Sequence, residues 1–189
     1  MTSSGTVEGG ERLRLFCALT LPETVLELVV AWQAKELADP VRTGRARIVP
    51  RDNLHATVAF LGSRPAEEAG SIGRELGAAA AAAGPIRLDL RRYRETRSVG
   101  MLVFDDVGGH AGRFALDVFA RLERLGVYGR EQRPWLPHVT VLRFRRVPRL
   151  HPPLPDLGEV SPSGAAVYLS ELRPGGAQYV VLESFVLGG

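Results

Sequence analysis

Two short stretches of the sequence repeat the same pattern of histidine and threonine. The first stretch, "NLHATVAFLG", contains His55 and Thr57, and the second, "LPHVTVLRF", contains His138 and Thr140. The whole chain has only four histidines. A titratable side chain beside a hydroxyl, repeated in two strand-like settings, predicts that the two copies act together on one substrate.

Strand geometry places the paired residues side by side. Successive side chains of a strand alternate between faces, so His55 and Thr57 share a face, as do His138 and Thr140. Because histidine titrates near neutral pH, one imidazole can take a proton from water while the other gives a proton to a leaving oxygen. The threonine hydroxyls can hold non-bridging phosphate oxygens. This arrangement predicts metal-independent displacement at phosphorus, with a strained five-membered cyclic phosphate as the substrate.

Other kinds of site lack the residues that they need. Two histidines and the single cysteine, Cys17, are too few to ligate zinc, and Asp52 accompanies only the first motif. The sequence has no serine-nucleophile elbow, phosphate-binding glycine loop or dinucleotide fingerprint. His110 and His151 lack a threonine two positions later, and we interpret them as structural or solvent-exposed. We therefore expect no metal and no cofactor.

The composition is that of an ordinary globular chain of 189 residues with a formal net charge of +3. Lys35 is the only lysine, so arginine, which suits phosphate, supplies nearly all of the positive charge. We attribute most of this arginine to a composition rich in alanine, arginine and glycine, and infer only that an anionic substrate is not repelled. No segment approaches the roughly 20 apolar residues that cross a bilayer. The start, "MTSSGTVEGG", lacks the pattern of a secretory signal, and we expect a disordered tail over 1–11, a cytoplasmic location and a monomer.

The rest of the sequence must supply the elements that hold the two motifs. Alternation over 12–21 predicts a half-buried strand, with Phe16 on the face opposite Cys17. Strands and helices mixed without regular alternation predict an α+β fold with antiparallel sheets, in two halves centred on His55 and His138. The further elements that we expect are a helix from Pro22 to about Ala38, strands over "RARIVP" and 54–61, a helix over 65–84, a hairpin of 86–95 and 99–107, a helix over 109–126, the strand "HVTVLRF", a proline-rich loop over 147–162 and a closing hairpin.

The motifs resemble those of the two-histidine (2H) phosphoesterase superfamily. More closely, the chain is similar to the LigT-like RNA 2′,3′-cyclic phosphodiesterases, historically called 2′-5′ RNA ligases. The opening "RLFCALTLP", both histidine motifs and the closing "AVYLSELRPGGAQYVVLESF" carry this resemblance, which spans about residues 12–187 in the family's order. It implies one bilobal domain over 12–189, with a pseudo-twofold pair of antiparallel sheets, flanking helices and a central cleft that holds both motifs.

The resemblance also implies the roles of the site residues. His55 would protonate the leaving 3′ oxygen and His138 would activate water. Thr57, Thr140 and Arg143 would bind the phosphate. The substrate would be RNA or a nucleotide with a 2′,3′-cyclic phosphate end, and the product would be a 2′-phosphate end.

Two residues keep alternative interpretations. Strict alternation places Arg143 on the face opposite His138, so a role at the phosphate needs a bulge or the end of the strand, and the alternative is a solvated arginine. Phe16 is a candidate for stacking on a base, with core packing as the alternative.

Three further functions share these features. They are hydrolysis of small cyclic nucleotides, joining of 2′-5′ RNA ends, and non-catalytic binding of RNA ends. A matched acid and base in both copies favours an enzyme over a binding module, because binding alone needs neither.

Overall fold

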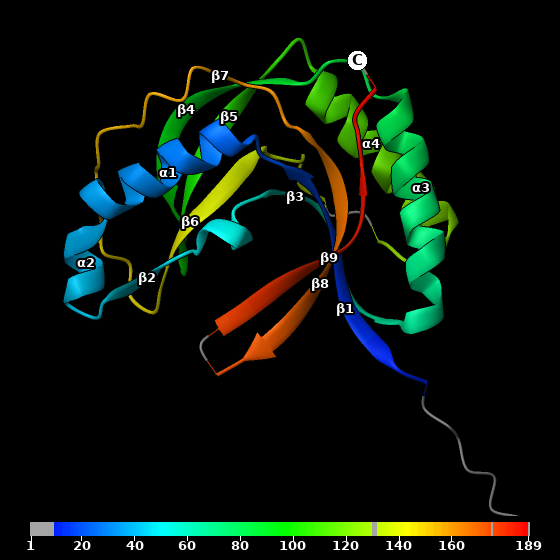
Figure 1. Cartoon of the computed structure of the whole chain (residues 1–189), viewed down its shortest axis with the longest axis horizontal. Helices are drawn as coiled ribbons and strands as arrows, with labels where there is room; N and C mark the ends of the chain where they lie inside the picture. The colour runs from blue at the N-terminus through cyan, green and yellow to red at the C-terminus, as the bar shows by residue number, and fades with distance from the viewer. Residues whose placement is uncertain (1–9, 130–131, 175, 189) are drawn as a thin grey trace, which may run out of the picture.

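Two antiparallel sheets flanked by helices make up the computed structural model, which describes residues 10–129, 132–174 and 176–188 (Figure 1). The strands are β1 (Arg12–Thr20), β2 (Ala46–Ile48), β3 (Ala56–Pro65), β4 (Arg87–Glu95), β5 (Val99–Val107), β6 (His138–Phe144), β7 (Glu159–Val160), β8 (Gly164–Arg173) and β9 (Gly176–Phe185). The helices are α1 (Glu23–Glu36), α2 (Ala38–Arg42), α3 (Ala69–Ala82) and α4 (His110–Arg124), with short 3₁₀ helices at Arg51–Asn53 and Ala66–Glu68. The predicted α+β class with antiparallel sheets is confirmed.

The two sheets do not correspond to the two halves of the sequence. The first sheet has the order β3-β1-β8-β9, so the C-terminal hairpin pairs with the strand at the start of the chain. The second has the order β2-β6-β5-β4-β7, and β2 from the first half pairs with β6. Each sheet therefore takes strands from both halves. One histidine motif lies on β3 in the first sheet and the other on β6 in the second sheet.

β1 is buried on both faces, so the expectation of a half-buried strand is wrong. Residues 15–19 each expose 2% or less of their surface, because hydrophobic side chains cover both faces of this central strand. The face with Cys17 joins the main core. The face with Phe16 packs against Tyr168 in a second, smaller cluster. Alternation identified the two faces correctly but could not reveal that aromatic side chains cover the second one.

The other elements follow the predicted order, with changes at their ends. β3 begins one residue after His55 and runs to Pro65, beyond its predicted end, so α3 begins only at Ala69. α2 and β7 have no counterpart among the predicted elements. β7 lies within the expected proline-rich loop and pairs with the edge of β4.

The predicted N-terminal tail over 1–11 falls mostly outside the described residues, which begin at position 10. Within the described part, the Glu11 carbonyl accepts a hydrogen bond from the Ala66 amide at 2.9 Å. No helix in the described parts of the chain is long and apolar enough to span a membrane.

A buried glutamine attaches α1 to the second sheet. Gln33 exposes 1% of its surface, and its side-chain amide donates to the carbonyls of Val49 (3.1 Å) and Val141 (2.8 Å). The register between β5 and β6 passes from Thr140 directly to Leu142, so Val141 is the extra residue of a β-bulge. A bulge disrupts the hydrogen-bond ladder locally, and Gln33 supplies a donor at that point. In Figure 1, α1 lies beside the strands of this sheet.

We predict that Gln33→Met destabilises the protein by about 1–3 kcal/mol, because methionine fills a similar volume but leaves the Val49 carbonyl without its donor in the interior. Chemical denaturation of the purified variant measures this change. Gln178→Met is the matched control, since Gln178 is exposed on β9 and its replacement should leave the free energy of unfolding unchanged. Equal stability of the two variants would contradict a structural role for Gln33.

Candidate active site

The bulge on β6 decides which side chains share a face with the second motif. Thr140 is half-buried, Val141 and Leu142 are both buried, and Arg143 is exposed. Two consecutive buried residues break strict alternation, so Arg143 returns to the face of Thr140. A bulge of the kind that a phosphate-binding role for Arg143 requires is therefore present at this point of the strand.

A bulge occurs at the matching position of the first motif. The register between β1 and β3 passes from Thr57 to Ala59, so Val58 is the extra residue. Val58 and Ala59 are both buried, and Phe60 emerges with 47% of its surface exposed. Phe60 thus stands five positions after His55, as Arg143 stands five after His138. The sequence reasoning missed Phe60, although this equal offset was a signal that could have found it.

The two histidine rings are held by the same kind of hydrogen bond. Nδ1 of His55 lies 2.8 Å from the Asn53 carbonyl, and Nδ1 of His138 lies 2.8 Å from the Leu136 carbonyl. A carbonyl oxygen can only accept, so Nδ1 carries a proton in both rings. In the neutral form each Nε2 then carries a lone pair, so Nε2 is the ring atom available for proton transfer. In the first motif, Nε2 of His55 lies 3.0 Å from the Thr57 hydroxyl.

Three aromatic rings pack around His55. The Phe16 ring centroid lies 4.9 Å from that of His55, and the Tyr168 and Tyr179 centroids lie 5.6 and 5.3 Å away. Phe16 also stacks on Tyr168 at 4.9 Å and exposes only 2% of its surface. Although Phe16 also lines the small cavity, a ring buried to this degree offers little surface to a base, and its contacts help to fix the position of His55.

The surroundings of His55 favour its neutral form. The pKa of His55 is lowered to about 4, mainly by burial and in smaller part by the nearby Arg143 guanidinium and His138 imidazole, while the hydrogen bond to the Asn53 carbonyl opposes the shift. The electrostatic influence of both residues on His55 also indicates that the two motifs are near each other. Without a bound anion, His55 is therefore uncharged at neutral pH.

Two adjoining cavities lie against the motifs. A small cavity of about 150 Å³ is lined by His55, Thr57, Thr140 and Arg143, together with Phe60 and others. A larger cavity of about 660 Å³ is lined by His138 and again by Thr57 and Phe60. Because Thr57 and Phe60 line both, the cavities meet between the two motifs.

A tryptophan links the two motifs directly. Nε1 of Trp135, three residues before His138, donates a hydrogen bond to the Thr57 carbonyl at 2.9 Å. This bond joins the segment that precedes β6 to the first motif on β3, close to the bulge at Val58. Nothing in the sequence indicates that Trp135 has a partner 78 positions away.

Arg143 is placed by Tyr179 at the opening of the small cavity. Its Nη2 lies 3.4 Å from the Tyr179 hydroxyl, and its guanidinium is exposed.

Within the described ranges, no three side chains of His, Cys, Asp and Glu gather in a group that could hold a metal ion.

Comparison with known sequences identifies related proteins. A family model described as "LigT like Phosphoesterase" matches residues 19–96. An RNA 2′,3′-cyclic phosphodiesterase from Thermus thermophilus is 36% identical, over 94% of this chain and 91% of the relative. A protein of the same name from Escherichia coli is 28% identical, over 94% of this chain and 98% of the relative.

Comparison with solved structures finds the same fold. The apo crystal structure of E. coli LigT superposes with a TM-score of 0.78 and 26% identity, covering 95% of this chain and all of the other. The crystal structure of TT0787 from T. thermophilus gives a TM-score of 0.76 with 33% identity, covering 94% and 99%. E. coli LigT has also been solved with 3′-AMP, with a TM-score of 0.77 to this chain.

We predict that stability falls as the pH is lowered from 6.5 towards 4. In this window the unfolded histidine binds a proton while native His55 does not, so the unfolded state binds more protons and protonation favours unfolding. The full shift corresponds to roughly 3 kcal/mol. Denaturation midpoints of the wild type and of His55→Asn, measured from pH 8 to pH 4, test this. The variant should lose less stability over this range, and parallel curves would contradict the assignment.

Proposed function

The chain belongs to the LigT-like phosphoesterases, and we propose that it hydrolyses 2′,3′-cyclic phosphate ends of RNA to 2′-phosphomonoesters. The observation that carries the proposal is the pair of bulges, which brings Phe60 and Arg143 to the faces of Thr57 and Thr140, against adjoining cavities that the two histidines also line. The names of the curated relatives support the choice of substrate.

In the proposed reaction, Nε2 of His138 takes a proton from the attacking water. The water oxygen forms a bond to phosphorus as the bond from phosphorus to the 3′ oxygen breaks. Nε2 of His55 donates a proton to the departing 3′ oxygen, which leaves a free 3′ hydroxyl and a 2′-phosphate. The hydroxyls of Thr57 and Thr140 and the Arg143 guanidinium hold the non-bridging oxygens, where negative charge increases in the transition state.

His55 can act as an acid only if the substrate changes its protonation. Burial is the main cause of the lowered pKa of His55, and a phosphate anion in the small cavity would stabilise the buried imidazolium directly and offset the smaller effect of Arg143 and His138. We therefore propose that substrate binding raises the pKa of His55, so that His55 takes up the proton that it later donates to the 3′ oxygen. The reverse assignment, with neutral His55 as the base, would need no such change.

Phe60 replaces Phe16 in this proposal as the ring that contacts a base. It is exposed, it lines both cavities, and the Arg14 guanidinium lies 4.8 Å from its ring centroid on one side. Phe16 becomes a positioning residue that packs against His55.

The cytoplasmic location and the monomeric state stay predictions. Sedimentation of the purified chain tests the monomeric state.

We predict that inorganic phosphate raises the pKa of His55. Histidine ring resonances, assigned by comparison with His55→Asn and followed through a pH titration, measure the pKa with and without phosphate. An upward shift supports His55 as the acid. An unchanged pKa under saturating phosphate would contradict this assignment and favour the reverse roles.

We predict that His55→Ala and His138→Ala each lower kcat on a 2′,3′-cyclic phosphate substrate by about 10²–10⁴-fold, because each removes one proton transfer. Affinity for the 2′-phosphate product should change far less, and wild-type turnover should survive chelators. His151→Ala, which removes an exposed histidine outside both motifs, is the matched control.

Equal loss of product binding and turnover in both variants would instead support a non-catalytic module that binds RNA ends. Turnover that chelators abolish would contradict the metal-independent mechanism.

A further inference from the structure

Five arginines line a third cavity, of about 650 Å³, beside the candidate active site. Arg45 and Arg47 come from the β2 region, and Arg143, Arg145 and Arg146 come from the end of β6 and the residues after it. We call this cavity the arginine groove. Arg143 lines both the groove and the small cavity of the active site, so the two adjoin at this residue.

The strand register places two of these arginines directly opposite each other. Arg47 on β2 pairs with Arg143 on β6, so the two side chains share a face. Like charges at such a position are destabilising. Phe144 is buried and Arg145 is exposed, so Arg145 lies on the same side of the chain as Arg143 and continues the row of arginines beyond β6. An anion bound between these side chains would neutralise a repulsion that the fold itself creates.

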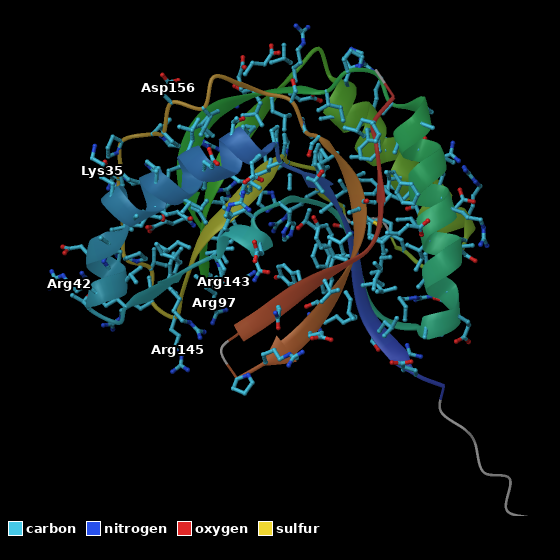
Figure 2. The ribbon with its side chains drawn as sticks, in the orientation of Figure 1. Lys35, Arg42, Arg97, Arg143, Arg145 and Asp156 are labelled. Carbon is cyan, nitrogen blue, oxygen red and sulfur yellow. The ribbon has the colours of Figure 1, made fainter. Side chains whose placement is uncertain are left out.

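Among the described residues, no ion pair neutralises the positive charge of the groove, although the charge of Arg45, after that of Arg42, contributes to the lowered pKa of the Asp39 carboxyl. All five arginines are exposed, and within the described residues none of them forms an ion pair. Many other arginines of the chain do have such a partner, for example Arg64 with Glu68 and Arg121 with Asp117. Figure 2 shows Arg143 and Arg145 on the same side of the molecule as Arg97, which lies in the turn between β4 and β5.

The chemistry of the lining identifies the ligand. Arginine forks bind phosphate oxygens in pairs, whereas the aromatic residue of the groove, Phe144, is 7% exposed and offers little ring to a base. The small cavity, at about 150 Å³, suits a terminal phosphate, so a further 650 Å³ of arginine-lined space next to it exceeds what a mononucleotide end needs. The lining therefore matches a chain of phosphodiesters and not a particular base.

We propose that the arginine groove binds the sugar–phosphate backbone of a single-stranded RNA whose reacting end lies in the small cavity, independently of base sequence. This inference rests on the proposed function and makes it more specific: the preferred substrate is an oligonucleotide and not a free cyclic nucleotide.

Arg47→Gln combined with Arg145→Gln tests the proposal without altering the histidine motifs. The kinetics of a short single-stranded RNA with a 2′,3′-cyclic end are compared with those of 2′,3′-cyclic AMP. KM for the RNA should rise about tenfold, since two exposed charge contacts contribute roughly 1.4 kcal/mol together. KM for the mononucleotide should change less than twofold. The salt dependence of RNA affinity should weaken by about 0.7 in log–log slope for each lost phosphate contact.

Matched controls separate charge from position. Arg74→Gln combined with Arg124→Gln removes the same charge from exposed sites on α3 and α4 and should leave KM for the RNA unchanged. Arg47→Lys combined with Arg145→Lys should keep most of the salt dependence. An equal effect of the groove and control variants, or an equal loss for RNA and mononucleotide, would overturn the proposal.

Direct binding distinguishes failure of this inference from failure of the proposed function. Fluorescence anisotropy with a labelled RNA bearing a 2′-phosphate end reports binding whether or not turnover occurs. If the wild type hydrolyses neither substrate, the proposed function fails, but weaker RNA binding by the groove variant alone still supports the groove. If RNA is hydrolysed and the groove variant binds and turns it over like the wild type, only the groove proposal fails.

Discussion

Two of the β-bulges in the sheets, at Val58 and Val141, are the constraint on which the candidate site depends. Each inserts one buried residue after the threonine of a motif and so brings the side chain three positions beyond that threonine back to the same face. Without the second bulge, Arg143 would point into the core that Leu142 now fills. Because of the bulges, β3 and β6 each present three side chains on the face of their motif. These are a histidine, a threonine and, as the third, Phe60 on β3 or Arg143 on β6.

Each bulge is held by a side chain from a distant part of the chain. The Gln33 amide, on α1, reaches the Val141 carbonyl, and the Trp135 indole reaches the Thr57 carbonyl beside the first bulge. Because a bulge weakens the ladder, these donors offset its cost and also tie helix α1 and the segment before β6 to the site. The exchange of strands between the two sheets has a similar effect, since Arg47 on β2 comes to lie opposite Arg143. The packing that stabilises the fold thus also determines the charge around the cleft.

Strand alternation was sufficient to predict that each histidine shares a face with its threonine, and hydrophobic periodicity predicted most helices and strands in the correct order. The position of Arg143 was not predictable, because a bulge depends on partners such as Gln33 that only the folded chain brings near. Burial on both faces of β1 was missed for the same reason: residues 15–19 alternate as expected, but the strands and rings that cover Phe16 lie far away in sequence. The sequence left Phe16 open to either base stacking or core packing, and the fold buries Phe16 while it exposes Phe60.

The direct test of the central claim is the identity of the phosphate product. An oligoribonucleotide with a 2′,3′-cyclic phosphate end is incubated with the wild-type protein, and the terminal phosphorus is assigned by ³¹P NMR spectroscopy. Proton donation by His55 to the 3′ oxygen predicts a single 2′-phosphomonoester. A 3′-phosphomonoester, a mixture of both, or an unreacted cyclic phosphate would contradict the account.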